Sequence, residues 1–202
     1  MKKTLLVFAA ILLFGLAGFA QDAEYPKFEL TGMASAFMAD VDVLGNETLW
    51  GWGIAGQGNI NKYFGIVGEW NANHGSSTIP DEITEEGDIP VDLRVQTILF
   101  GPRFSYRAKA VTVFGHFLIG AATLKVDDES NLIEGLDEMT NWQVAYAIGG
   151  GLDINVGKHF AIRPIQLDYV FIDSDLPQEL GSSQAPGAFN NVRYNFGATF
   201  KF

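Results

Sequence analysis

The chain has 202 residues, a formal net charge of −11 and only 18 % charged residues. Its acidic balance excludes a nucleic-acid-binding protein, which needs a basic surface, and the absence of cysteine excludes disulfides and thiolate chemistry. The charged fraction is below the roughly 25 % usual in soluble domains. This low charged fraction, together with 23 glycines and 16 phenylalanines, favours lipid-facing strands over helices.

The first 20 residues have the three parts of a secretory signal peptide. Lys2 and Lys3 form a cationic start, residues 5–19 carry no charge, and the small residues Gly18 and Ala20 precede a cleavage site. The apolar run of about 15 residues is shorter than the roughly 20 that a membrane-spanning helix needs. We therefore expect cleavage after Ala20 and a single domain over residues 21–202, whose later segments contain no candidate membrane helix.

Alternating polar and apolar residues dominate the rest of the chain. Because successive strand side chains point to opposite sides, this alternation predicts strands with one apolar and one polar face. Eight such strands are expected, at residues 27–38, 50–60, 64–71, 92–100, 110–123, 141–154, 159–171 and 191–202.

Three of these strands need comment. In the first strand, Met33 and Phe37 fall on the polar face and interrupt the pattern. In residues 92–100, Leu93 and Val95 are expected on the apolar face and Arg94 on the polar face. In residues 159–171 the polar positions shift by one after residue 164, a proline. Proline cannot donate to a strand ladder, so we expect a β-bulge at residues 163–164.

The connections between the strands alternate in length. Residues 61–62, 105–109 and 155–158 are short links, whereas 44–49, 73–91, 126–140 and 173–189 are longer, and two of these long loops are rich in Asp and Glu. Short turns at one rim and long loops at the other are typical of an outer-membrane barrel, with both chain ends on the periplasmic side.

The volume of the side chains indicates which face meets lipid. Eight strands enclose a space barely wide enough for side chains, and the polar face carries many small residues, while the apolar face carries tryptophans near the strand ends. We therefore predict an all-β fold, an eight-stranded antiparallel up-and-down transmembrane β-barrel with a mostly plugged, polar interior. The predicted interior network consists of Glu29, Glu69, Arg94, His116, Asp153, Arg163, Asp168 and Arg193.

Several stretches resemble the small outer-membrane β-barrel domain family of OmpA-like and porin-family proteins. They are residues 99–104 (LFGPRF), 149–153 (GGGLD), 161–163 (AIR) with 168–169 (DY), and the terminal Phe202. The resemblance implies location in the bacterial outer membrane, contact with its lipid, and assembly by periplasmic chaperones and the barrel-assembly machinery, with Phe202 as the assembly signal. It also implies a chain without the peptidoglycan-binding domain of full OmpA-type proteins.

The function expected from this fold is structural, surface-interacting or porin-like. Two alternatives remain open: a narrow passive pore for small solutes, and a soluble exported lipocalin-like binder of apolar ligands with its faces reversed. No enzyme is expected, because His74, His116 and His159 show no pattern of nucleophile, base and orienting acid. No cofactor or metal is expected either, since the acidic loops lack the ligand order of an EF-hand.

Overall fold

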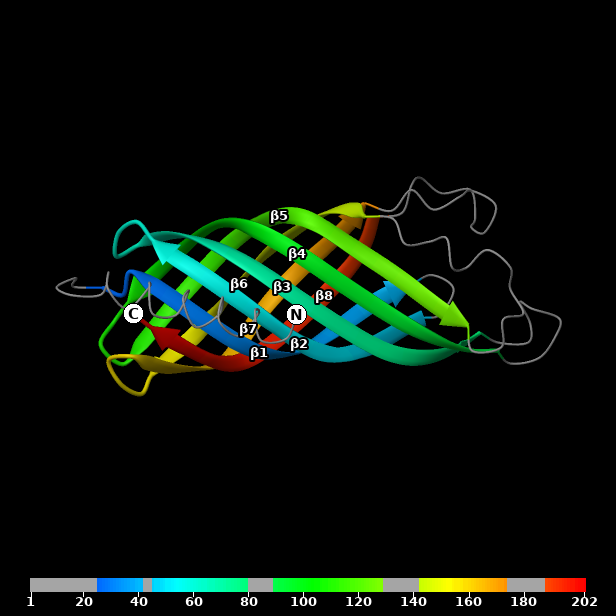
Figure 1. Cartoon of the computed structure of the whole chain (residues 1–202), viewed down its shortest axis with the longest axis horizontal. Helices are drawn as coiled ribbons and strands as arrows, with labels where there is room; N and C mark the ends of the chain where they lie inside the picture. Colours follow the sequence, from blue (N-terminus) through cyan, green and yellow to red (C-terminus); the bar gives the residue numbers. More distant parts are fainter. Residues whose placement is uncertain (1–24, 42–44, 80–88, 129–141, 174–187) are drawn as a thin grey trace, which may run out of the picture.

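The structure, a computed structural model, describes residues 25–41, 45–79, 89–128, 142–173 and 188–202. In these ranges each strand is hydrogen-bonded to the next in antiparallel order, and the last pairs with the first, so the sheet closes into a barrel (Figure 1). The predicted all-β barrel is thus confirmed, and the predicted signal peptide lies outside the described residues. The strands are β1 (Phe28–Val41), β2 (Gly45–Asn59), β3 (Phe64–Ile79), β4 (Ile89–Arg107), β5 (Val111–Asp128), β6 (Gln143–Asn155), β7 (Phe160–Asp173) and β8 (Ala188–Lys201).

The three short connections lie at one rim of the barrel, together with the end of β8 (Figure 1). At this rim the backbone amide of Lys27 donates to the carbonyl of Phe202, and the amide of Phe202 donates to the carbonyl of Phe28, which closes the seam between β1 and β8. Within the described ranges no helix is long and apolar enough to cross a membrane.

Strands β3, β4 and β5 are longer than the sequence predicted, with 16, 19 and 18 residues. The expected end at Phe100 was wrong, because β4 continues through Pro102 to Arg107. Pro102 pairs in register with Ile66 of β3, whereas the pairing with β5 omits residues 101–102 and resumes at Arg103. The missing amide donor of the proline therefore interrupts one ladder locally without ending the strand.

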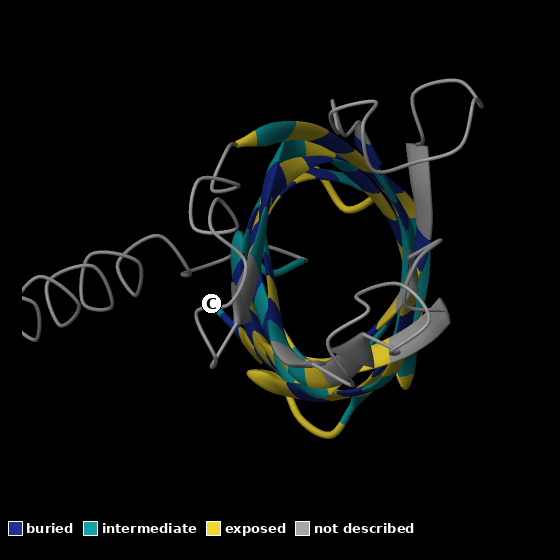
Figure 2. Ribbon diagram, turned by 90° about the vertical axis from the view of Figure 1, so that its right-hand side faces the viewer, coloured by how far each residue is buried: buried dark blue, intermediate teal, exposed yellow. Residues whose placement is uncertain are grey.

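The apolar faces of the strands point outward, as predicted. Trp50, Phe100 and Trp142 are each more than half exposed, whereas Arg163 and Arg193 inside the barrel are almost fully buried. Viewed from the long-loop end, the strands form a closed ring around one lumen (Figure 2). The reversed, soluble lipocalin-like barrel is therefore not favoured, because it would bury the large rings and expose the charges.

The register shift predicted near Pro164 is present. The pairing of β7 with β8 shifts between Arg163 and Gln166, and the pairing of β6 with β7 shifts between Leu152 and Ile154. At the bulge the hydroxyl of Tyr194 donates a hydrogen bond of 2.8 Å to the carbonyl of Pro164. Tyr194 thus satisfies a backbone acceptor at an irregular point of the ladder, which matters because hydrocarbon offers no water as a substitute.

This contact predicts that Y194F lowers the free energy of unfolding by about 1–3 kcal/mol, the cost of leaving a part-buried acceptor unpaired where hydrocarbon offers no water. The measurement is urea unfolding of the protein refolded in lipid vesicles. The matched control is Y106F, at an exposed tyrosine on β4, which should change stability by less than about 0.5 kcal/mol. An equal effect of both substitutions would contradict the assigned role of the Tyr194 hydroxyl.

Candidate functional site

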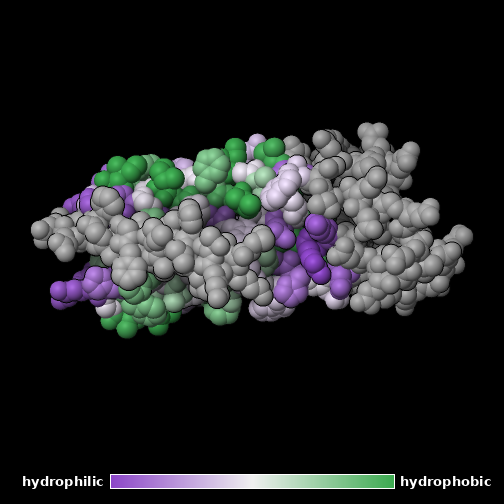
Figure 3. All heavy atoms as spheres, in the orientation of Figure 1, coloured by the Kyte–Doolittle hydropathy of each residue, from purple (hydrophilic) through white to green (hydrophobic). Residues whose placement is uncertain are grey.

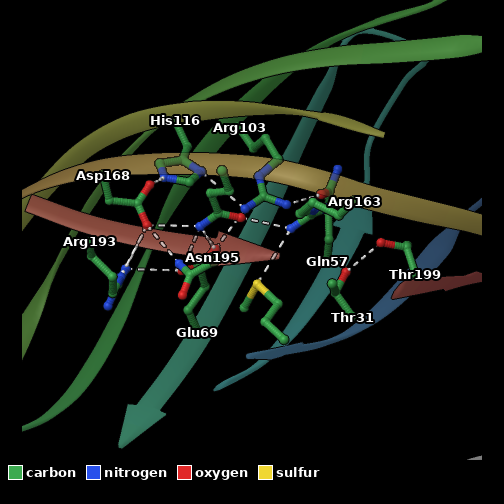
Figure 4. A network of polar contacts seen from close by, with 12 residues as sticks. Thr31, Gln57, Glu69, Arg103, His116, Arg163, Asp168, Arg193, Asn195 and Thr199 are labelled. Atoms are coloured by element: carbon green, nitrogen blue, oxygen red, sulfur yellow. Dashed lines mark hydrogen bonds and ion pairs between the residues drawn. The ribbon is translucent and has the colours of Figure 1, made fainter. Parts of the chain in front are cut away.

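The most distinctive chemical feature of the fold is a network of charged side chains inside the barrel (Figure 4). Such charges can be buried only when each has a partner of opposite sign and further hydrogen bonds. Among the described residues, the buried charged side chains are four carboxylates and four cations: Glu29, Glu69, Asp153 and Asp168, with Arg103, Arg163, Arg193 and Lys201.

Asp168 on β7 is one centre of the network. Its Oδ2 accepts hydrogen bonds from Nη2 and Nε of Arg193, at 2.9 and 3.2 Å, and from Nε2 of Gln166 at 2.9 Å. Asn195 donates to the same oxygen at 3.3 Å. Gly149 on the neighbouring β6 makes room for this carboxylate, because a Cβ atom there would lie 2.2 Å from Oδ1 of Asp168.

Glu69 on β3 is the second centre. Its Oε1 accepts a hydrogen bond of 2.8 Å from Nη2 of Arg103, and its Oε2 accepts one of 3.3 Å from Nη2 of Arg193. Gln166 donates to both oxygens, at 3.2 and 3.3 Å. Since Arg193 contacts both Glu69 and Asp168, the two centres form one connected cluster that spans the lumen.

His116 on β5 links Arg103 to Asp168. Nη2 of Arg103 lies 3.0 Å from Nδ1 of His116, and Nε2 of His116 lies 2.8 Å from Oδ1 of Asp168. A guanidinium can only donate, so Nδ1 accepts and the proton of the neutral ring is on Nε2, where it is donated to the carboxylate. Both ring nitrogens are therefore engaged in the network.

A second cluster lies beside the first. Arg163 holds Asp153 through two contacts, Nε to Oδ1 at 2.7 Å and Nη2 to Oδ2 at 3.1 Å, which is the strong two-pronged geometry. Nη1 of Arg163 donates to Oε1 of Gln166 at 2.8 Å and so joins the clusters. The guanidinium carbons of Arg103 and Arg163 lie 4.3 and 4.4 Å from the ring centroid of Phe114, an additional cation–π stabilisation.

A third group of contacts closes the short-turn rim. Nη2 of Arg107 lies 2.5 Å from Oε1 of Glu29 and 2.9 Å from Oδ1 of Asn59. Asn59 in turn donates to Glu29 at 2.8 Å. On the other side of this rim, Nζ of Lys201 donates to Oδ1 of Asn155 at 2.5 Å.

Toward the long-loop rim the lumen lining contributed by β4 to β7 becomes largely apolar, which the sequence did not predict, while β3 and β8 still bury Asn73 and Asn191. Each of β4 to β7 carries inward polar residues in its short-turn half and inward apolar residues beyond them, as Arg103 and Leu93 do on β4. The expected polar interior is thus correct for only part of the lumen. The buried residues of this apolar layer include Phe37, Leu49, Leu93, Val95, Leu118, Ala122, Ala145, Ala147, Val170 and Ile172. 

The structure places seven of the eight residues expected in the interior network inside the barrel, all with side chains that are nearly fully buried: Glu29, Glu69, His116, Asp153, Arg163, Asp168 and Arg193. The eighth, Arg94, was predicted wrongly. Its side chain is exposed on the outer face, and the inward positions beside it are Leu93 and Val95. The reason is the apolar layer, which reverses the polarity of the two faces in this part of β4.

Sequence reasoning missed Arg103, Gln57 and Gln166 as members of the network. Arg103 lies three residues beyond the expected end of its strand, so its face was not assigned. The sequence did contain a signal for Arg103. Arg103, Ser105 and Arg107 are polar residues at alternate positions, so in a longer strand they share one face. The glycine-rich stretch at 149–151 has the structural role of close strand approach, with no helix following it.

A closed barrel with apolar rings outside and paired charges inside is the architecture of a transmembrane β-barrel. The family described as the outer membrane protein beta-barrel domain matches residues 6–202, and the chain belongs to this family. Its location is therefore the bacterial outer membrane. No curated protein matches the sequence.

Solved structures of small outer-membrane barrels share the fold at low sequence identity. Neisserial surface protein A (NspA) has a TM-score of 0.63 at 12 % identity, covering 89 % of this chain and 100 % of its own. Ail, the attachment invasion locus protein of Yersinia pestis, crystallised with the heparin analogue sucrose octasulfate, has a TM-score of 0.51 at 16 % identity, covering 87 % of this chain and 96 % of its own. OprG from Pseudomonas aeruginosa has a TM-score of 0.51 at 13 % identity, covering 90 % of this chain and 98 % of its own.

The shared role of Asp168 predicts that D168N strongly destabilises the barrel. Loss of this charge leaves Arg193 with one carboxylate partner and His116 without its ionic acceptor, at a cost of about 3–5 kcal/mol, which urea unfolding in vesicles would measure. The control is D92N, which removes a carboxylate that accepts a hydrogen bond from Ser76 in an exposed position, with an expected cost of at most about 1 kcal/mol. Similar losses for the two variants would contradict the network assignment.

Proposed function

We propose that this protein is a closed, non-conducting outer-membrane scaffold with a structural or surface-binding role. The observation that carries the proposal is the cluster of Glu69, Arg103, Asp168 and Arg193, whose contacts join strands on opposite arcs of the barrel. An ion could cross this level only by separating guanidinium and carboxylate groups that lie 2.8–3.3 Å apart and have no access to bulk water.

The apolar layer adds a second barrier. Residues such as Phe37, Leu93, Leu118 and Val170 are buried against one another in the lumen, above the charged cluster. Apolar side chains offer no hydrogen bonds to water and no hydration to ions. An apolar constriction therefore resists conduction even where it is wide enough for an ion. A charged layer and an apolar layer in series support a sealed barrel over a pore.

With the lumen closed, the long loops are the parts available for specific binding, because loops on a rigid scaffold commonly carry recognition. The names of two structural neighbours, a surface protein and an attachment invasion locus protein, agree in kind with a surface-interaction role. The acidic loops expected from the sequence lie largely outside the described residues. Because their carboxylates would repel an anionic partner, we propose that the partners are not strongly anionic.

Assembly by periplasmic chaperones and the barrel-assembly machinery, with Phe202 as signal, is part of the same proposal. Phe202 lies at the seam that closes last in the chain order, and its backbone pairs with Lys27 and Phe28 of the first strand region. Its ring lies 4.8 Å from Phe200 and 6.1 Å from Phe28, measured between centroids. This position supports a role in seam closure as well as in recognition.

The proposal predicts no conductance steps when the refolded protein is inserted into a planar lipid bilayer. The double substitution E69Q/R193Q removes one carboxylate and one guanidinium from the cluster without changing net charge and is expected to give measurable steps. Insertion is verified by heat-modifiable migration of the same samples. Reproducible steps from the unmodified protein would instead support the alternative of a narrow passive pore and overturn the sealed scaffold.

We also propose that the barrel is not a lipid-modifying enzyme. Both nitrogens of His116 are committed to Arg103 and Asp168, and Nδ1 of His159 lies 3.0 Å from the carbonyl of Lys201. Mass spectra of lipid A from cells expressing the protein should therefore equal those from cells expressing H116A and from cells with empty vector. A new lipid A species that depends on His116 would disprove this.

A further inference from the structure

Strand β5 extends beyond its neighbour β6 at the long-loop end of the barrel. The pairing of β5 with β6 ends at Ala122 and Gln143, whereas its pairing with β4 continues to Asp128 and Val91. Within the part of the chain that the structure describes, residues 123–128 therefore have a neighbouring strand on one side only. Figure 1 shows this end of β5 projecting past the start of β6.

Alternate residues of this segment direct their backbone groups to the unpaired side. At the start of β5 the carbonyl of Val111 accepts a hydrogen bond from the chain that leaves β4, whereas the carbonyl of Ala110 accepts one from Asn155 at the end of β6. Odd-numbered residues of β5 thus bond to β4 and even-numbered residues to β6, because antiparallel strands alternate in this way and both registers run along β5 without a shift. The amide and carbonyl groups of Leu124 and Val126 therefore lie on the unpaired edge.

The unpaired edge lies beyond the lipid-facing part of β5. The outward residues Val113, Phe117 and Ile119 are exposed and apolar, and Lys125 follows at an outward position. Hydrophilic side chains also gather toward the long-loop end of the face shown in Figure 3, next to the apolar surface. An unpaired strand edge would be costly in hydrocarbon, whereas at this level it is available to water or to another chain.

We propose that the edge of β5 at residues 123–128 binds an extended segment of another protein by β-strand addition. Backbone donors and acceptors that alternate along a strand are complemented by a second extended polypeptide, and not by a lipid or a glycan. The length of the edge is that of a common strand. This inference rests on the surface-binding role proposed above, and it identifies the part of the barrel and the kind of partner.

The charges along the edge favour one order of residues in the added segment. Lys125 and Asp127 are alternate residues, and in register they pair with Arg94 and Asp92 of β4. Like charges paired in this way repel each other, so an added strand gains by placing a basic residue opposite Asp127 and an acidic residue opposite Lys125. An antiparallel segment meets Asp127 first, and Val126 lies between the two charges. The favoured order in the partner is therefore basic, apolar, acidic.

Peptide titration of the full protein in lipid nanodiscs tests the proposal. The probe is a capped peptide, Thr-Lys-Val-Glu-Val-Thr, which carries the favoured order, and the matched control exchanges its Lys and Glu. The protein should bind the probe at least about fivefold more tightly than the control, because the control replaces two opposite-charge pairs by two like-charge pairs. The variant K125E/D127K has the same net charge and should reverse this preference.

Amide hydrogen exchange, followed by NMR on the same samples, locates the bound peptide. In the free protein the amides of Leu124 and Val126 should exchange faster than those of Lys125 and Asp127, which by the same alternation bond to β4. Addition of the probe should slow exchange at Leu124 and Val126 and leave Lys125 and Asp127 unchanged.

Four results would overturn strand addition. They are the absence of saturable binding, equal affinities for the probe and the control, and an unchanged preference in K125E/D127K. The fourth is slow exchange of Leu124 and Val126 in the free protein, which would show that the edge is already paired, for example with residues 129–141 of the same chain. Each of these results would leave the sealed scaffold standing, because the bilayer recordings test that proposal separately.

Discussion

Charged side chains buried inside a closed sheet must be paired, and this requirement shapes the whole barrel. Closure satisfies the backbone of every strand in hydrocarbon, but eight strands leave a lumen with little room for water. Charged side chains can stay there only if their partners stand at matching heights on other strands. The contacts of Glu69 with Arg103 and Arg193, and of Asp168 with His116 and Arg193, meet this requirement.

The same requirement explains several local features. Gly149 is needed because the Asp168 carboxylate occupies the space of a side chain on the adjacent strand. The bulge after Arg163 lets that residue and Gln166 both face inward, three positions apart, where strict alternation would point them to opposite faces. Tyr194 then covers the carbonyl that the bulge exposes on the lipid side.

The barrel has two halves along its axis, and the inward and outward faces of the strands differ in polarity between them. In the short-turn half the lumen is ionic and the outside apolar, as in a simple membrane barrel. In the long-loop half the inward faces of β4 to β7 are largely apolar, although β3 and β8 still bury Asn73 and Asn191 there. The outer face of β3, β4 and β5 becomes polar. Arg94 belongs to this second environment, where an outward charge meets headgroups or water, so its exposure has little cost.

Four features of the fold could be predicted from the amino-acid pattern: the number of strands, their antiparallel order, the outward position of the large rings and the bulge at Pro164. They could be predicted because a period of two and the turn spacing are local properties of the chain. The pattern also indicated most of the inward charges. Which charges meet depends on the folded barrel, since partners such as Glu69 and Arg193 are 124 residues apart and become neighbours through barrel closure and register. The outward position of Arg94 also depends on the fold. Alternation separates two faces of a strand but does not identify the environment of either, and that environment changes along the barrel axis.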